Sequence, residues 1–364
     1  MSHTHLEDFY TFEGHFTFDL HDLAAIVLRE RQQSVDPFKR ARVVEICEGD
    51  TTATCLPPHA QTMWTSMKAP HKTAYFLKTE ADLDDAANLQ GPLEVADFFD
   101  PEMKLSPGHA PLTDKEKEMV YWKIRHHDGG ILICEALQQV LDALPEDRTR
   151  LRIRTSQGLE IPQSPIDAFG IGNVAVIPRE STYICDYQHI KPLSTQVGMN
   201  QYLSGHTSEP QPVVYLLFGD SSIPAGGLVA LDLASPSLGM RGLGGESFAL
   251  ERVVDYHKRV LPNGGKRVID YDDSRSEEYD GFFLTDRIRN FSRPELEPIV
   301  NDLAERVIRR LSRIARGEET FCAYCGKVDA KDRCSKCKTS MYCGRACQTS
   351  AWKYHKKWCV LDAK

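Results

Sequence analysis

The sequence lacks the features that would place it in a membrane or in the secretory pathway. No apolar run approaches the roughly 18–20 residues that a membrane-spanning helix needs. The N-terminus has no basic start followed by an apolar stretch, so we expect no secretory signal there. Cysteine is scarce through the first 316 residues, where it occurs singly at Cys47, Cys55, Cys134 and Cys185. These absences favour the nucleus, the cytoplasm or both, where thiols stay reduced.

Composition also excludes a disordered chain, a collagen and a coiled-coil rod. The 364 residues are enough for about two domains, and 41% apolar with 26% charged residues is an ordinary globular balance. Residues 317–364 carry 10 Lys and Arg against 5 Asp and Glu, a charge of +5, whereas residues 1–316 carry 34 against 47, a charge of −13. We therefore expect an acidic body and a basic tail.

Hydrophobic periodicity predicts an α+β protein with a mixed body over residues 1–290. Apolar residues at helical spacing predict one helix from Leu20 to Arg31 and a second after the Gly129-Gly130 turn. Alternating or continuous apolar residues predict core strands. These strands are expected near residues 151–153, 174–177, 213–218 and 228–233.

A linking amphipathic helix is predicted over residues 291–317. Ser292 offers an N-cap, Pro294 suits the first turn, Glu295 completes a capping box, and Gly317 ends the pattern. The expected apolar face is Leu296, Val300, Leu303, Val307, Leu311 and Ile314. The arginines between them predict a solvated face that pairs with the acidic body, or alternatively a phosphate-binding surface. They are Arg306, Arg309, Arg310, Arg313 and Arg316.

Eight candidate metal ligands follow one another near the C-terminus in four pairs. The pairs are Cys322 and Cys325, Cys334 and Cys337, Cys343 and Cys347, and His355 and Cys359. A Cys-x2-Cys turn presents two sulfurs to one ion, and two ligands four positions apart share one helical face. Eight such ligands are the complement of two tetrahedral zinc ions.

Distances along the chain indicate how the pairs combine. Joining the two Cys-x2-Cys pairs would leave only eight residues between Cys325 and Cys334, fewer than the usual ~12–20. Interleaving leaves 17 residues between Cys325 and Cys343, and 17 again between Cys337 and His355. We therefore assign Cys322, Cys325, Cys343 and Cys347 to zinc 1, and Cys334, Cys337, His355 and Cys359 to zinc 2.

Both ions then have four protein ligands, so no coordination position is left for water and the zinc ions are structural. A segment of this size has too little apolar material for a core of its own, so we expect it to be unfolded without metal. Metallation also changes the charge of the tail: seven thiolates add −7 and two Zn²⁺ add +4, so +5 becomes +2.

This segment resembles the MYND-type zinc finger, including its Tyr-Cys-x3-Cys-Gln-x3-Trp-x2-His-x3-Cys run from Tyr342 to Cys359. The resemblance covers residues 320–361 and agrees with the interleaved, cross-braced pairing. It implies a module that binds proline-rich peptides of partner proteins, often transcriptional regulators. The positions that match its peptide groove are Ser335, Gln348 and Trp352. An exposed Trp beside a Gln offers such a peptide an apolar platform and an amide.

Two tryptophans and a lysine group leave alternatives open. We expect Trp358 to pack inside the finger, whereas Trp352 either packs there or forms the platform. Lys353, Lys356 and Lys357 suggest DNA binding, but a net charge of only +2 is a weak electrostatic footprint and favours a solvated face.

The competing hypothesis is an enzyme in the body, with the finger as a targeting module. No Asn-His-Ser-Cys stretch resembles the cofactor site of SET methyltransferases. His126-His127-Asp128 with His257 and Arg267 is a weak pattern for an oxygenase iron site, and a surface turn at residues 126–130 is favoured instead. Gly170-Ile-Gly172 loosely matches a dinucleotide fingerprint but is expected to be a turn between strands. The sequence therefore favours a zinc-binding regulatory adaptor.

Overall fold

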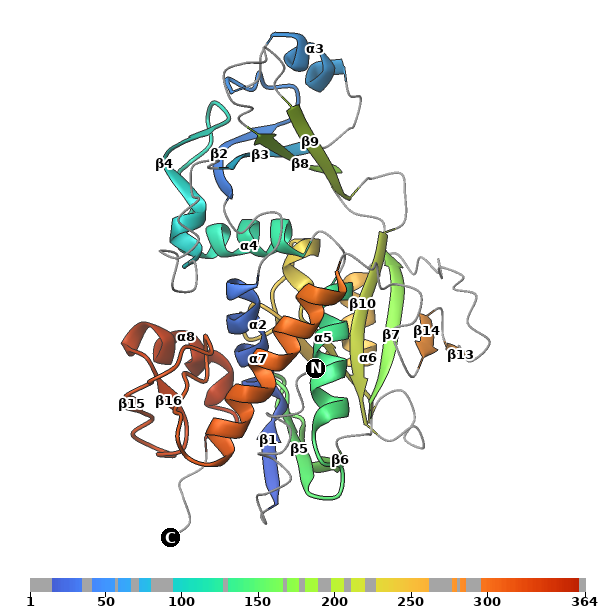
Figure 1. Ribbon diagram of the computed structural model, residues 1–364, viewed down its shortest axis with the longest axis vertical. Helices are drawn as coiled ribbons and strands as arrows, with labels where there is room; N and C mark the ends of the chain where they lie inside the picture. Colours follow the sequence, from blue (N-terminus) through green and yellow to red (C-terminus); the bar gives the residue numbers. More distant parts are fainter. Residues whose placement is uncertain are drawn as a thin grey trace.

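Two large sheets and two small ones carry the strands of this α+β fold, with helices packed against them (Figure 1). The computed structural model describes residues 15–34, 41–55, 58–66, 72–79, 94–126, 130–165, 169–176, 181–188, 198–205, 211–219, 227–261, 277–279, 282–285 and 296–359. The α-helices within these ranges are α2 (Leu20–Gln33), α3 (Pro58–Ser66), α4 (Asp114–Arg125), α5 (Ile131–Ala143), α6 (Val253–Val260), α7 (Glu297–Ala315) and α8 (Arg345–His355). Two short 3-10 helices are η1 (Val95–Phe98) and η3 (Ser235–Leu238).

The largest sheet is six-stranded and antiparallel, in the order β12-β11-β10-β7-β14-β13. Its strands are β12 (Ala249–Arg252), β11 (Val229–Asp232), β10 (Gln211–Phe218), β7 (Phe169–Val176), β14 (Phe282–Thr285) and β13 (Glu277–Tyr279). Val214 and Leu216 of β10 enter the main core with α5 and α7, whereas Val213 and Tyr215 enter a second core with α6. This period-2 alternation buries both faces of the sheet.

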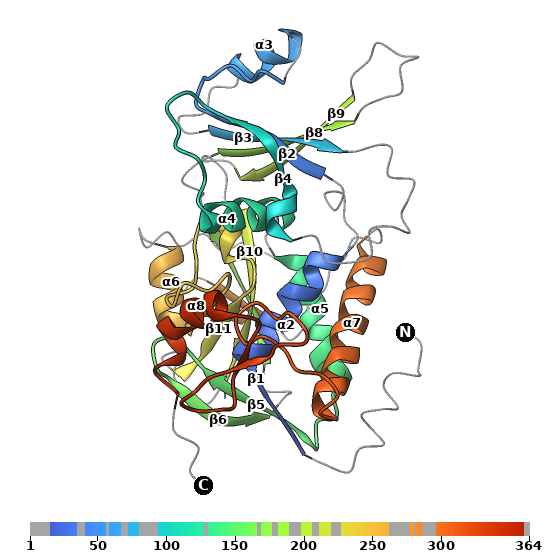
Figure 2. The same ribbon diagram turned by 90° about the vertical axis from the view of Figure 1, so that its left-hand side faces the viewer.

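A second, five-stranded sheet in the order β4-β2-β3-β8-β9 lies at one end of the molecule, with α3 on its outer side and α4 between it and the rest (Figures 1 and 2). Its strands are β4 (Phe99–Leu105), β2 (Ala41–Glu48), β3 (Lys72–Thr79), β8 (Ser181–Gln188) and β9 (Gly198–Gly205). Trp64 of α3 packs edge-on against Phe76 and Tyr183 in a small core of its own.

Of the two small sheets, one belongs to the body and the other to the C-terminal segment. One has the order β1-β5-β6, and the other is the pair β15-β16. Their bounds are β1 (Phe16–Asp19), β5 (Thr149–Arg154), β6 (Glu160–Pro165), β15 (Asp332–Arg333) and β16 (Met341–Tyr342). Asp19 ends β1 and caps α2, because its carboxylate accepts a hydrogen bond from the His21 backbone at 3.0 Å.

The predicted helices after Leu20 and after Gly130 correspond to α2 and α5. Gly130 adopts φ = +89°, and a Cβ there would lie 2.7 Å from the Ala234 side chain. Both the backbone conformation and the lack of space therefore require glycine at this position. The capping box predicted at residues 292–295 lies outside the described residues. Helix α7 is described from Glu297, and Gly317 follows it in the left-handed region at φ = +70°, as a C-terminal glycine does.

Helix α7 does more than link, because its apolar face completes the main core. Val300, Leu303, Val307 and Leu311 are buried there with side chains of α2 and α5. The body and the C-terminal segment are thus joined through a shared core element.

One turn prediction for the body is wrong, and a second is only partly correct. Gly172 lies inside β7, where the Tyr215 ring of the neighbouring strand occupies the space that a Cβ would need, at 2.5 Å. At the predicted turn of residues 126–130, His126 and Gly130 have turn conformation, but both are buried, so their predicted place on the surface is wrong. The His126 ring stacks on Trp122 at 4.9 Å between ring centroids. His127, Asp128 and Arg267 lie outside the described residues, and His257 Nε2 lies 2.6 Å from the Tyr215 hydroxyl. In the part of the chain that the structure describes, no helix combines the length and apolarity of a membrane span.

Candidate metal centre and its interface with the body

Two similar backbone turns position the Cys-x2-Cys pairs. In the first, Cys322 NH donates to the Lys327 carbonyl and Gly326 NH to the Cys322 carbonyl, both at 2.8 Å. In the second, Cys334 NH donates to the Ser340 carbonyl and Lys338 NH to the Cys334 carbonyl, both at 2.9 Å. Each turn ends in the left-handed region, at Gly326 (φ = +68°) and Lys338 (φ = +57°). Each turn therefore brings both of its thiols to the same side.

The four pairs converge into two groups, and within each group all donor atoms lie within 4.8 Å of one another. The groups are Cys322, Cys325, Cys343 and Cys347, and Cys334, Cys337, His355 and Cys359. These are the sets that the interleaved spacing predicts, so the cross-braced arrangement is present. Helix α8 carries both Cys347 and His355 and thereby joins the two groups.

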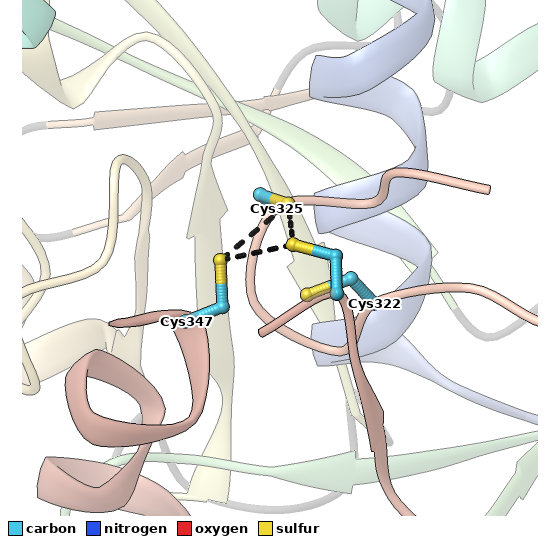
Figure 3. A group of neighbouring side chains, drawn as sticks. Cys322, Cys325 and Cys347 are labelled. Atoms are coloured by element: carbon cyan, nitrogen blue, oxygen red, sulfur yellow. Dashed lines mark hydrogen bonds between the residues drawn. The ribbon is translucent and has the colours of Figure 1, made fainter. Parts of the chain in front are cut away.

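The geometry fits tetrahedral zinc. Sulfur–sulfur distances in the two groups run from 3.4 to 3.8 Å. Zn–S bonds of about 2.3 Å in a tetrahedron give edges of about 3.8 Å. Figure 3 shows the sulfurs of Cys322, Cys325 and Cys347 pointing toward one another.

The thiols of the first group also affect one another's ionisation. Hydrogen bonds from Cys325 and Cys347 lower the pKa of Cys322 to about 2. The hydrogen bonds that Cys325 and Cys347 make with Cys322 have the opposite effect on these two thiols. They raise the pKa of Cys325 to about 12 and that of Cys347 far above its ordinary range. The approach of these sulfurs thus favours one thiolate and opposes the ionisation of the neighbouring thiols. A divalent ion supplies the positive charge that makes further thiolates favourable.

The second group presents its ligands in suitable protonation states. Burial lowers the pKa of His355 to about 4, so its ring is neutral at pH 7. Its Nε2 lies 3.4 Å from Cys334 Sγ and 3.6 Å from Cys337 Sγ, and therefore faces the centre of the group. Burial opposes ionisation of Cys337, but hydrogen bonds from Ser340 and Thr339 outweigh it and lower the pKa of this thiol to about 6. The donors fit two structural zinc ions, which would cross-link the turns and α8.

The comparison with known families agrees with this geometry. The profile of the MYND finger matches residues 322–359, which contain all eight ligands. Residues 322–359 are a MYND finger. As such, the segment is a zinc-binding protein-interaction module, attached to an α+β body.

Curated relatives share this type of finger. The MYND-type zinc finger protein samB of Aspergillus clavatus is 34% identical over 104 aligned residues, covering 23% of this chain and 16% of that protein. The samB protein of Aspergillus niger is 33% identical over 126 residues, covering 29% of this chain and 19% of its own length. The chain thus spans less than a fifth of these relatives. No solved structure matches it.

The MYND finger lies against α2 of the body, and its first turn touches that helix directly (Figures 1 and 2). A Cβ on Gly326 would lie 2.2 Å from the Ala25 carbonyl oxygen and 2.8 Å from the Arg29 side chain. The next residue, Lys327, lies 3.6 Å from Glu94, which Arg29 also holds through two hydrogen bonds of 3.0 and 3.2 Å. Gly326 is therefore needed for contact with the body as well as for the turn.

A buried arginine links the finger to two helices of the body. Arg310 of α7 donates to Glu30 of α2 at 3.0 Å, to Glu319 at 2.8 Å and to the Gly326 carbonyl at 2.8 Å. The three charged side chains are at most 8% exposed. The prediction that Arg310 pairs with the acidic body is confirmed by Glu30, but its predicted solvation is wrong because Arg310 is buried. Arg309 is exposed and pairs with Glu305 of its own helix.

The far end of the finger packs on the body through aromatic rings. Trp358 lies 5.5 Å from Tyr354 of α8, 5.6 Å from His21 of α2 and 5.0 Å below the Arg154 guanidinium of β5. His21 is itself buried, 4.3 Å from the Tyr354 ring. Trp358 therefore packs inside the finger, as expected, and also against the body.

The residues predicted for peptide binding are not buried in this interface. Trp352 is 44% exposed, Ser335 is exposed and Gln348 is half-buried. The sequence did not indicate the specific contacts of Gly326, Arg310 and His21, because a turn glycine, a helix arginine and a lone histidine have ordinary local explanations.

The interface also contains a pocket of about 200 Å³ that is open to solvent on one side, and Asp22 lies in its wall. Burial, reinforced by Asp19, raises the pKa of the Asp22 carboxyl to about 7, against the opposing effect of Arg154 and Arg152. A carboxyl whose pKa is higher in the folded than in the unfolded state makes its least favourable contribution to protein stability at high pH. For Asp22, stability is therefore lost as the pH rises from about 4 to 7.

Replacing Asp22 with asparagine is therefore expected to increase stability at alkaline pH. We expect Asp22→Asn to raise the free energy of unfolding at pH 8 by about 2 kcal/mol, and by about 1 kcal/mol less at pH 5.5. Urea unfolding of the zinc-loaded protein measures both. The exposed Asp332→Asn serves as the control and should change stability by less than ~0.5 kcal/mol. A destabilised Asp22→Asn at pH 8 would contradict the assignment.

Proposed function

We propose that this chain is a regulatory, transcription-associated adaptor that recruits a partner through a proline-rich peptide bound to its MYND finger. The proposed groove consists of Ser335, Gln348 and Trp352, and the proposed site of action is the nucleus, the cytoplasm or both. The zinc ions have a structural role in this function, because every ligand position is filled by protein.

The observation that carries the proposal is the contrast between two tryptophans of one finger. Trp358 is buried against the body at 9% exposure, whereas Trp352 is 44% exposed. Tyr354 and His355 between them are buried, so the helix has a packed side and an open side. Exposure of an apolar indole to water is unfavourable, so covering it with a peptide is favourable. A proline-rich segment is already extended and loses little conformational entropy when it binds there.

The way the finger packs on the body is consistent with a peptide binding on the open side, at Trp352. Gly326, Arg310 and Trp358 hold the finger on the body, and none of them lies in the proposed groove. A partner could therefore bind Trp352 without displacing the finger. The Gln348 side chain, one helical turn before Trp352, can offer both a donor and an acceptor to a peptide backbone.

The test is a peptide-binding measurement on the whole zinc-loaded chain. A panel of labelled proline-rich peptides is screened by fluorescence polarisation, and the tightest binder is titrated against variants. Trp352→Ala is expected to weaken binding about thirtyfold, the scale of an interfacial tryptophan, and Gln348→Ala less. Thr349→Ala, at an exposed neighbouring position on α8, serves as the control. Unchanged binding by Trp352→Ala with Gln348→Ala, at two zinc ions per chain, would reject the groove.

A further inference from the structure

The open side of α8 and the residues after it carry positive charge and no acidic residue. Residues 345–359 contain no Asp or Glu. The four cationic residues of this stretch are all exposed: Arg345, Lys353, Lys356 and Lys357. The modest net charge of the metallated finger hides this distribution, because the thiolates face the zinc positions and not this surface.

The body adds a fifth cation next to Lys353. Lys115, in the first turn of α4, is exposed, and its ammonium group lies close to that of Lys353. The closeness of the Lys353 charge lowers the pKa of Lys115, because two like charges repel each other. Lys353 also lies close to the body at Gly245, because its Nζ is 3.7 Å from the position that a Cβ on Gly245 would occupy. Two ammonium groups held side by side by a docked finger form a site for an anion.

Two acids close to Lys115, Glu116 and Glu118, already have partners. Glu118 has one carboxylate oxygen 2.5 Å from Arg241, and its other oxygen accepts a short hydrogen bond from Ser247. Glu116 is used to close the capping box with Thr113 at the start of α4. In the ranges that the structure describes, neither Lys115 nor Lys353 forms a salt bridge with a carboxylate.

We propose that Lys115, Lys353, Lys356 and Lys357, named here the basic face, bind carboxylate side chains that flank the proline-rich segment of the partner. This inference rests on the proposed function and extends it: Trp352 contacts the prolines and the basic face selects acidic neighbours. Lys115 belongs to the body, so the complete site exists only while the finger is docked.

An acidic peptide fits this surface better than nucleic acid does. The body carries −13 against +5 for the segment after residue 316, so a long row of phosphates leaving the finger would meet repulsion. A short peptide can place a few carboxylates on the basic face without extending over the acidic body. The central indole likewise favours a ligand that combines apolar and acidic groups.

The experiment uses three fluorescent peptides with one oligoproline core, flanked by Asp residues, by Ser residues or by Lys residues, together with a random-sequence DNA duplex. The full chain loaded with zinc should bind the Asp-flanked peptide about tenfold more tightly than the Ser-flanked one at about 50 mM salt, and this advantage should shrink at about 300 mM. Lys115→Glu with Lys353→Glu should abolish the advantage and leave the Ser-flanked affinity unchanged. Lys104→Glu, an exposed lysine of β4, is the control for a change of charge.

Each contrary result has a defined meaning. Equal affinities for the Asp- and Ser-flanked peptides would overturn the basic face and leave the proline groove intact. Tighter binding of the DNA duplex than of the Asp-flanked peptide would replace the acidic peptide with nucleic acid as the ligand. Failure of every peptide to bind a folded, zinc-loaded chain would overturn both the groove and the basic face.

Discussion

Removing zinc is expected to unfold the MYND finger and to destabilise the body with it. Structural zinc sites contribute about 10–16 kcal/mol to the folding of small domains. Here the finger also packs on α2 and α7, so its unfolding would expose buried parts of the body, including His21 and the carboxylates around Arg310. We expect chelation to lower the melting temperature of the body by about 5–10 °C, in addition to the loss of the finger's own signal.

Calorimetry with and without a chelator tests this, with bound zinc counted by a colorimetric dye. Cys343→Ala should give the same loss without a chelator, because it removes one ligand of the first group. Cys55→Ala is the matched control, since this thiol belongs to neither ligand group. A body that melts at the same temperature with and without zinc would show that the interface contributes no stability.

The metal centre was predictable because its information is local. Four ligand pairs at rigid spacings leave few ways to build two tetrahedra, and separations of 17 residues favour the interleaved one. Helices α2 and α5 and strand β10 were predictable for a similar reason, since a strong apolar period decides each of them within its own segment.

The remaining features depend on contacts between distant segments, and no local pattern reports these. Gly172 is a strand residue because Tyr215 covers it, 43 positions later in the chain. His126 is buried because Trp122 and the surrounding core accept its ring. The periodicity that predicts α7 places Arg310 beside four other arginines, and only the positions of Glu30 and Glu319 distinguish it from them. The basic face was missed in part for the same reason, because Lys115 reaches Lys353 only through docking.

Arg310→Ala is expected to be the most damaging substitution in the interface outside the zinc ligands. Among the described cations that contact the Glu30 and Glu319 carboxylates, Arg310 is the buried one, because Arg306 and Arg313 reach them from more exposed positions. Its removal leaves two buried carboxylates poorly compensated and the Gly326 carbonyl without this donor. Breaking such a network by deleting one partner costs about 3–5 kcal/mol.

Arg309→Ala provides a matched control on the same helix. Arg309 is half-exposed and pairs with Glu305 one turn earlier, a contact worth about 0.3–0.5 kcal/mol. Urea unfolding should therefore separate two neighbouring Arg→Ala variants by at least about 2 kcal/mol. Zinc release to a chelator should also be faster in Arg310→Ala alone, because the Gly326 turn that positions Cys322 and Cys325 loses its contact with α7.

A compensated variant distinguishes the charge network from a simple loss of packing. If the penalty comes from uncompensated carboxylates, then Arg310→Met combined with Glu30→Gln and Glu319→Gln should recover most of the stability that Arg310→Ala loses, as apolar replacement of buried ion networks often does. A combined variant as unstable as Arg310→Ala would show instead that the arginine acts mainly through its donor to Gly326. Equal stability of Arg309→Ala and Arg310→Ala would remove Arg310 from the interface altogether, and the finger would then be held chiefly by Gly326 and Trp358.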